Sequence, residues 1–376
     1  MKILFDLTAL YDHLTGIERF AMNISKNIIS QHPENTYVLV FKHEIHEQYL
    51  AEKNQDNVEC VILPKCHKLV FYQWRLMRTL YKIKADRYVF LSFVSPWLFR
   101  NKNIINTIHD ISAWDCPGSR KAYMVLYGRI GIRNALRNSK KIVTVSEFSK
   151  ERIVKRLNGN ANNINVVYNG VSKQFMEFSA DAAEMNKIKE KYHLPKRYIL
   201  CLSTLEPRKN MKLLIEAYGE LISEQKIDTE LVLAGRKGWK LDQAVGDNAQ
   251  LSDKIHITGF IDDDDLPAIY KGAELFVFPS LYEGFGIPVI EAMSQGTIVV
   301  SSDSSSLPEV VGDAGFLFKS KDKESLKRCI IKTLNLNNIE RKLVVDKELE
   351  QSKKFDWSKE AEKCINVHCK KLISKN

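Results

Sequence analysis

Apolar residues recur along this chain in two alternating patterns. Short, nearly continuous apolar runs are separated by longer segments in which apolar residues recur at helical spacing. Continuous runs are typical of parallel strands that helices cover on both faces. We expect strands at 2–7, 36–41, 88–93, 103–110, 140–146 and 164–171, and then at 198–204, 229–235, 254–259, 274–280 and 297–302. We expect helices at 17–30, 211–225, 264–273 and 288–296, and a Lys-rich one at about 357–374.

The two successive series of strands and helices predict two doubly wound α/β domains with parallel sheets. A polar, helix-prone stretch at 172–195 separates the series. We therefore expect an N-terminal domain at 1–171, joined by the last helix at 355–376, and a C-terminal domain at 172–354. Ligands of such sheets bind beyond the carboxyl ends of the strands. Two sheets that face one another would bring these ends together across a cleft.

Composition narrows the class of protein. Of the 376 residues, 44% are hydrophobic and 27% are charged, which is typical of a globular chain rather than a disordered one. The net charge of +10 favours an anionic partner such as nucleic acid, a lipid surface or phosphate, although a generally Lys-rich composition would also produce it. The seven scattered cysteines lack zinc or redox spacing, which predicts reduced thiols. No apolar run is long enough to span a membrane, and the N-terminus resembles a first strand more than a signal peptide.

The segment 281–296 combines acids, glycines and a proline between a strand and a helix. Pro288 has a backbone angle suited to the first position of a helix, so Glu283 is expected in the loop and Glu291 in about the first helical turn. Gly284 and Gly286 would allow the backbone to approach a ligand closely. Free amides at a helix start favour oxygen ligands, and the glutamates can accept hydrogen bonds from paired hydroxyls. A nucleotide sugar fits this chemistry; an ordinary glycine-rich turn is the alternative.

A second polar segment, 203–217, places Arg208 and Lys209 in the loop that enters a helix. Two cations at a helix N-terminus oppose the helix dipole, and a bound anion would remove that local cost. Arginine suits bidentate contact with phosphate, and lysine supplies a point charge. The segment therefore indicates a phosphate site, unless it is a solvated basic turn.

Several motifs together resemble the retaining glycosyltransferases of family 4, which have the GT-B fold. They are "TGIERF", "IHD", "VSEFSK", "YNGV", "EPRKN", "LAGRKGW" and "EGFGIPVIEAM", in the order of the family. The resemblance covers about 15–318 and includes the pattern of two glutamates separated by seven residues. It is strongest to bacterial mannosyltransferases of lipopolysaccharide and capsule assembly. It implies two Rossmann-like domains, with the acceptor on the first and the donor on the second.

The resemblance also implies roles for individual residues. Arg208 and Lys209 would bind the diphosphate and stabilise the departing nucleotide, Glu283 would contact the transferred sugar, and Glu291 would hold the ribose. His109 would lie near the sugar and the acceptor, with Asp110 either orienting its ring or capping the loop. The further donor-binding residues implied are Gly16, Gly259, Phe260, Gly284, Phe285, Gly286 and Ile287. We expect Ser146 to cap a helix, with Ser149 in its first turn.

Family membership, rather than spacing, implies a retaining outcome by transfer on the face that the nucleotide leaves. We expect no cofactor and no metal, because side-chain cations would neutralise the diphosphate. The four acids at 262–265 precede a helix and suit its dipole, so we read them as structural rather than as metal ligands.

The segments 65–87 and 118–141 are basic and aromatic. They suit helices at the surface of an anionic membrane, where polyprenyl-diphosphate-linked glycan acceptors reside, or helices that pack Leu69, Trp74 and Leu76 into their own domain. Nucleic acid is not expected, because no recognised reader motif is present. We expect a cytoplasmic protein on the inner face of the inner membrane, and the sequence gives no oligomeric state.

The function that the sequence favours is transfer of a hexose, with mannose from GDP-mannose as the first choice, to a lipid-linked intermediate of O-antigen or capsule. The alternatives are a UDP-sugar or dTDP-rhamnose donor, a nucleotide-sugar 2-epimerase, and a non-catalytic glycan-binding scaffold. The glutamate motif argues against the epimerase.

Overall fold

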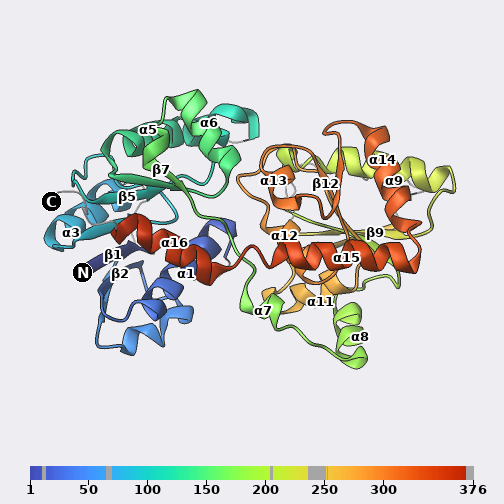
Figure 1. Ribbon diagram of the computed structural model, residues 1–376, viewed down its shortest axis with the longest axis horizontal. Helices are drawn as coiled ribbons and strands as arrows, with labels where there is room; N and C mark the ends of the chain where they lie inside the picture. The colour runs from blue at the N-terminus through green and yellow to red at the C-terminus, as the bar shows by residue number, and fades with distance from the viewer. Residues whose placement is uncertain are drawn as a thin grey trace. The chain divides into compact units, whose positions relative to one another are not determined.

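The computed structural model describes residues 1–10, 14–64, 70–119, 121–203, 206–235, 251 and 253–369. The chain divides into two compact units. The N-terminal unit comprises residues 1–169 together with the segment that begins at Asp356, and the C-terminal unit comprises Gly170–Phe355. Figure 1 labels the elements of both units.

The N-terminal unit contains a seven-stranded parallel sheet of order β3-β2-β1-β4-β5-β6-β7. Its strands are β1 (Lys2–Asp6), β2 (Thr36–Lys42), β3 (Val58–Leu63), β4 (Arg87–Phe90), β5 (Ile104–Thr107), β6 (Lys141–Thr144) and β7 (Ile164–Val166). Its helices are α1 (Gly16–Gln31), α3 (Met77–Lys82), α4 (Ser112–Asp115), α5 (Ala122–Asn138), α6 (Glu147–Leu157) and α16 (Trp357–Cys369), and a π-helical segment, η3 (Phe71–Leu76), precedes α3.

The C-terminal unit contains a six-stranded parallel sheet of order β10-β9-β8-β11-β12-β13. Its strands are β8 (Tyr198–Leu202), β9 (Glu230–Ala234), β10 (Ile255–Gly259), β11 (Leu275–Phe278), β12 (Val299–Ser302) and β13 (Phe316–Phe318). Its helices are α7 (Lys173–Met176), α8 (Ala182–Lys191), α9 (Met211–Ser223), α11 (Leu266–Lys271), α12 (Ile287–Ser294), α13 (Leu307–Val311), α14 (Lys323–Leu334) and α15 (Asn338–Ser352).

Burial explains why the strands were recognisable from the sequence. The central strands β1, β2, β8 and β11 are almost wholly buried, as parallel strands covered on both faces must be. Two strands were missed. In β3, exposed and half-buried positions interrupt the apolar run, and β13 is only three residues long. Both are edge strands. Edge position alone does not explain the two misses, because the edge strands β7 and β10 were expected from the sequence; the interrupted apolar run of β3 and the short length of β13 explain them.

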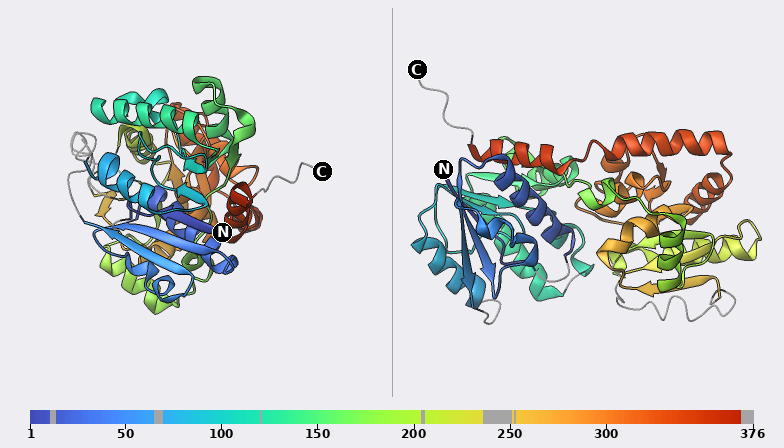
Figure 2. Two further views of the ribbon diagram at one scale, coloured as in Figure 1. Left: turned by 90° about the vertical axis from the view of Figure 1, so that its left-hand side faces the viewer. Right: turned by 90° about the horizontal axis from the view of Figure 1, so that it is seen from below.

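The last helix packs on the first. Helix α16 lies along α1 in both Figure 1 and Figure 2. The Gln31 amide donates a hydrogen bond of 2.6 Å to the Ser358 hydroxyl, and the Tyr168 backbone N–H donates one of 2.9 Å to Glu360. These contacts hold the end of the described chain on the N-terminal unit. Within the described ranges, no helix combines the length and apolar character that crossing a membrane requires.

Local capping follows the sequence closely at two helix starts. The Ser146 hydroxyl accepts a 3.0 Å hydrogen bond from the Ser149 backbone N–H, which confirms the predicted cap of α6. At α1, the Glu18 carboxylate accepts a 3.0 Å hydrogen bond from the Thr15 backbone N–H. Gly16 is the first residue of this helix, which therefore begins one residue earlier than the expected 17.

Candidate active site

The loop between β11 and α12 carries Glu283. It follows the carboxyl end of β11, a central strand of the C-terminal sheet. The loop ends at Gly286, whose φ is +122°, and a Cβ added there would lie 2.8 Å from the Leu307 side chain. A glycine is therefore required at this position both by backbone angle and by space. Helix α12 then begins at Ile287, with Pro288 in its first turn.

Arg208 and Lys209 lie on a 3₁₀ turn, Pro207–Lys209, that follows β8. Strands β8 and β11 are neighbours in the sheet, so the turn and the Glu283 loop meet at the same edge. The Leu281 backbone N–H donates a 2.7 Å hydrogen bond to the Arg208 carbonyl. The two loops are thus fixed to one another through their backbones before any side chain is considered.

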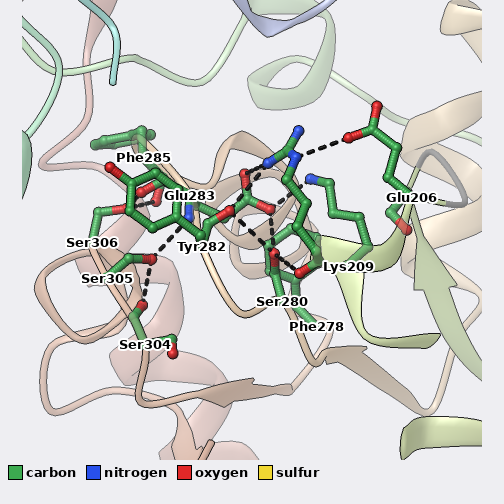
Figure 3. A network of polar contacts seen from close by, with 12 residues as sticks. Glu206, Lys209, Phe278, Ser280, Tyr282, Glu283, Phe285, Ser304, Ser305 and Ser306 are labelled. Carbon is green, nitrogen blue, oxygen red and sulfur yellow. Dashed lines mark hydrogen bonds and ion pairs between the residues drawn. The ribbon is translucent and has the colours of Figure 1, made fainter. Parts of the chain in front are cut away.

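The Glu283 carboxylate joins the two cations. Its Oε1 accepts hydrogen bonds of 2.6 Å from the Lys209 ammonium and 2.6 Å from the Ser280 hydroxyl, and its Oε2 accepts one of 3.1 Å from the Arg208 guanidinium. Figure 3 shows the Lys209 and Ser280 side chains converging on this carboxylate. Burial by itself would raise the pKa of Glu283, but the charges of Lys209 and Arg208 hold it below its ordinary value. We call these four residues the Glu283 cluster.

The two cations differ in their surroundings. Lys209 is only 8% exposed, and its ammonium lies 5.2 Å from the centre of the Phe278 ring. Arg208 also donates to the Tyr282 carbonyl at 3.1 Å and to the Glu206 carboxylate at 2.8 Å. The guanidinium is thereby held in one orientation by three oxygens. Glu206 belongs to the "EPRKN" motif, but the sequence assigned it no role; its position two residues before an arginine was the only signal.

A group of serines supports the backbone of the Glu283 loop, as Figure 3 shows. The Glu283 N–H donates a 2.9 Å hydrogen bond to the Ser305 hydroxyl. The Ser306 hydroxyl contacts two carbonyls, those of Glu283 at 3.1 Å and Phe285 at 2.7 Å. Ser305 has a positive φ of 55°. Sequence reasoning missed these residues, because the run "SSDSSSLP" indicates only a turn.

Glu291 is placed separately from the Glu283 cluster. It is the fifth residue of α12, and therefore in the second helical turn rather than the first, and it is 5% exposed. The Tyr270 hydroxyl donates a 3.2 Å hydrogen bond to its Oε2. Tyr270, which is fully buried in α11, was not identified from the sequence. A buried carboxylate positioned by a tyrosine can accept hydrogen bonds from a pair of hydroxyls.

The other predicted donor-binding residues of the C-terminal unit lie on two loops. Gly259 ends β10 with a φ of +74°, and Phe260 after it is 44% exposed. Gly284 and Phe285 lie in the Glu283 loop, but the Phe285 side chain is buried and packs edge-on against Phe355, with ring centres 5.4 Å apart. The Phe285 ring is therefore part of the packing of the C-terminal unit rather than a surface for a ligand. Most of the "LAGRKGW" motif, 236–239, lies outside the described residues.

His109 and Gly16 belong to the N-terminal unit. The His109 ring is half-buried, packs edge-on against Phe20, and places Nε2 2.8 Å from the Leu91 carbonyl oxygen. A carbonyl can only accept, so Nε2 holds a proton. Burial lowers the pKa of His109. A neutral ring with a protonated Nε2 leaves Nδ1 as an acceptor. Asp110 accepts a 2.8 Å hydrogen bond from the Ser112 N–H, so of its two predicted roles the structure shows the loop cap.

The acids at 262–265 form ion pairs at the surface of the C-terminal unit. The Lys191 ammonium lies 2.8 Å from Asp262 and 2.6 Å from Asp265. In the part of the chain that the structure describes, no group of three or more histidine, cysteine or acidic side chains is arranged to hold a metal ion. Asp262 and Asp265 therefore tie the start of α11 to α8.

The chain is similar in sequence to known proteins over nearly its whole length. The chain matches the family model "Glycosyltransferase Family 4" over residues 14–175 and the model "Glycosyl transferases group 1" over residues 184–348. It is 31% identical to the O-antigen chain mannosyltransferase B of Escherichia coli, over 98% of this chain and 99% of that one. It is 29% identical to the O-antigen chain mannosyltransferase RfbU of Salmonella typhimurium, over 70% and 69% of the two chains.

Solved structures share the fold at low sequence identity. A glycosyltransferase from Rickettsia africae superimposes with a TM-score of 0.74 at 17% identity, covering 100% of this chain and 99% of that one. The Anabaena protein HepE, solved in complex with UDP and glucose, gives 0.74 at 18% identity, over 98% and 99%. Two parallel α/β units of this kind are the GT-B architecture, which confirms the predicted fold class.

Proposed function

Because the chain belongs to the family 4 glycosyltransferases, we propose that it transfers mannose from GDP-mannose to a growing surface glycan with retention of configuration. The observation that carries the proposal is the Glu283 cluster, in which two fixed cations converge on one buried carboxylate. The choice of mannose is supported by the names of two relatives, both O-antigen mannosyltransferases. A UDP-hexose is the second candidate donor, since HepE was solved with UDP and glucose.

Arg208 and Lys209 would bind the diphosphate of the donor. In the absence of a ligand, part of their charge is compensated by Glu283 and Glu206. A diphosphate would take over some of these hydrogen bonds and leave Glu283 to accept hydrogen bonds from the sugar. Negative charge grows on the departing phosphate during transfer, and cations that are already in place stabilise it without reorganisation.

The proposed sugar transfer needs only the donor and the acceptor. The acceptor oxygen forms a bond to the anomeric carbon while the bond from that carbon to the phosphate oxygen breaks. The acceptor proton passes to a phosphate oxygen of the departing nucleoside diphosphate. We further propose that no metal or cofactor takes part, because the Arg208 and Lys209 cations neutralise the diphosphate. His109 would offer Nδ1 to a sugar hydroxyl.

The proposal is tested with purified protein and a panel of GDP-mannose, UDP-hexoses, UDP-N-acetylhexosamines and dTDP-rhamnose. We expect one donor to raise the melting temperature and to release nucleoside diphosphate when a glycan acceptor is added. If only a UDP-sugar raises the melting temperature and releases nucleoside diphosphate, the transferred sugar is that of the UDP donor rather than mannose. The absence of any effect with every nucleotide would instead favour a non-catalytic scaffold.

Glu291→Ala should weaken donor binding about tenfold or more, because hydrogen bonds to a buried carboxylate contribute about 1.5–3 kcal/mol. These contacts to ribose would exist before the reaction. Isothermal titration with the donor nucleotide measures the effect. The matched control is Glu350→Ala, whose side chain on α15 is 71% exposed. An unchanged dissociation constant of the donor nucleotide for Glu291→Ala would contradict the proposal that Glu291 binds the ribose.

We also propose that the N-terminal unit binds the surface of an anionic membrane, where a polyprenyl-diphosphate-linked acceptor would reside at the cytoplasmic face of the inner membrane. Trp74 is 58% exposed, which rules out its predicted packing into the domain, whereas Leu76 is fully buried and Leu69 lies outside the described residues. Further large apolar side chains are exposed on α3, on α5 and between them: Tyr81, Leu98, Tyr123 and Leu126.

These side chains lie on segments that contact one another. The Gln73 amide donates a 3.1 Å hydrogen bond to the Tyr127 hydroxyl, and the Tyr81 hydroxyl donates one of 3.1 Å to the Leu98 carbonyl. Exposed cations lie on the same helices: Arg78, Lys82, Lys121, Arg133 and Arg137. Apolar anchors among cations are typical of elements that bind anionic lipid surfaces.

Co-sedimentation with vesicles measures this interaction. We expect binding to vesicles that contain phosphatidylglycerol, weaker binding to neutral phosphatidylcholine, and loss of binding at high salt. The pair of substitutions Trp74→Ala and Leu126→Ala should reduce binding about tenfold or more. Met176→Ala, which removes a 57% exposed side chain from the C-terminal unit, is the control. Equal binding by wild type and the double variant would contradict the membrane assignment.

A further inference from the structure

Three neighbouring strands of the N-terminal sheet end in chemically distinctive residues. Asp6 is the last residue of β1, Phe93 follows β4, and His109 follows β5. The sheet order β3-β2-β1-β4-β5 reverses direction between β1 and β4. In open parallel sheets, ligands bind beyond the carboxyl ends at such a reversal. Asp6 and Phe93 therefore flank the position where this sheet is expected to bind a ligand.

The Asp6 carboxylate is the centre of a hydrogen-bond network at that edge. The carboxylate is 2% exposed. It accepts hydrogen bonds of 2.7 Å from the Tyr72 hydroxyl and 2.6 Å from the Thr8 hydroxyl, and one of 3.1 Å from the Thr8 backbone N–H. Tyr72 itself is 8% exposed and comes from η3, so this contact fixes the η3 segment against β1. The Tyr72 ring thereby has one orientation.

Phe93 rests on the ring that Asp6 fixes. The Phe93 and Tyr72 rings meet edge to face, with centres 6.1 Å apart and planes at 84°. Phe93 is nevertheless 37% exposed, although it is a large apolar side chain at the edge of a buried sheet. The loop that carries it is also tied to His109, through the Leu91 carbonyl. An oriented, exposed aromatic ring is therefore presented next to a candidate catalytic histidine.

We propose that Phe93 is the stacking platform for a sugar ring of the acceptor glycan, with Tyr72 and Asp6 as positioning residues. A pyranose presents one face of C–H bonds, and the electron-rich face of an aromatic ring is complementary to it. The Glu283 cluster and Glu291, which we assign to the donor, belong to the other unit; at this edge of the N-terminal sheet a contact has been proposed for His109 but none for Phe93. The inference rests on the proposed function, because it presumes a glycan acceptor.

A sugar suits this place better than a lipid chain. A lipid chain offers no hydrogen-bond donor to His109, whereas a sugar ring offers hydroxyls to it. Trp74 and Leu126, the two side chains chosen above for substitution in the membrane test, lie on η3 and α5 rather than on the segment between β4 and β5 that carries Phe93 and Leu98. Glycan binding and membrane binding can therefore be tested separately by mutation.

The experiment measures initial rates with a soluble α-mannooligosaccharide acceptor on an alkyl aglycone. Phe93→Ala should raise the acceptor KM about tenfold and leave the donor dissociation constant unchanged, since the ring contacts only the acceptor. Phe93→Trp should retain most of the affinity. Tyr72→Phe and Asp6→Asn should raise the same KM to a smaller extent. Ile62→Ala, which truncates a 47% exposed side chain on the edge strand β3, is the control.

An equal acceptor KM for wild type and Phe93→Ala would overturn the platform. A loss that occurs only with membrane-bound acceptor would also overturn it, because the ring would then contact lipid. Saturation-transfer NMR with the same oligosaccharide tests binding without turnover. If the oligosaccharide binds wild type but not Phe93→Ala, the platform is supported even when no sugar is transferred. Oligosaccharide binding that Phe93→Ala leaves unaffected would refute it. Absence of transfer by wild type would count against the proposed function instead.

Discussion

Lys209→Ala should lower turnover by about 10²-fold or more, the loss typical of removing one preorganised group that stabilises developing negative charge. The ammonium is nearly buried, 2.6 Å from Glu283 and beside the Phe278 ring, so water cannot easily replace it. The measurement is the rate of nucleoside diphosphate release at saturating donor and acceptor. Arg208→Ala should have a loss of the same order.

Matched variants separate catalysis from folding. Lys212→Ala removes a cation that is 80% exposed, only three residues further along the chain, and should leave turnover unchanged. Arg208→Lys keeps the charge but loses the planar fork that contacts Glu206, Tyr282 and Glu283, so an intermediate rate is expected. Turnover of Lys209→Ala within about a factor of two of wild type, with an unchanged melting temperature, would contradict the role of this lysine in charge stabilisation.

Glu283→Ala should lower the free energy of unfolding of the C-terminal unit by about 3 kcal/mol or more, because it leaves two adjacent cations without their shared buried partner. Differential scanning calorimetry measures the change in melting temperature. Glu350→Ala removes one partner of an exposed pair on α15 and should have an effect below about 1 kcal/mol. Equal melting temperatures for Glu283→Ala and wild type would show that the cluster does not stabilise the fold.

The Glu283 cluster also predicts a pH dependence. The folded-state pKa of Glu283 lies below its ordinary value of 4.5, so its pairing stabilises the fold above pH 4.5. That contribution is lost as the pH falls through the lowered pKa. Glu283→Gln cannot titrate, and its melting temperature should therefore decline less than that of wild type on acidification. A parallel decline in both proteins would assign acid sensitivity to other carboxyl groups.

The alternation of buried strands and amphipathic helices was readable in the sequence because burial on both faces leaves continuous apolar runs, as in β1 and β8. Two local features were also readable from the sequence. Ser146 caps α6 through a residue three positions away, and Gly286 adopts a backbone angle that favours glycine. Each of these features depends on neighbours in the chain. Strands β3 and β13 were missed because exposed positions interrupt the apolar run of β3 and because β13 has only three residues.

The sequence by itself determined which residues follow which strand, and so which side chains could reach a ligand at the carboxyl edge. Only the tertiary structure decided that Glu283, Lys209 and Arg208 form one cluster, that Ser305 and Ser306 support its backbone, and that Tyr270 positions Glu291. The reason is physical. Lys209 and Glu283 are 74 residues apart, and they meet because β8 pairs with β11 rather than with β10. Strand order depends on the packing of the whole sheet, and no local pattern encodes it.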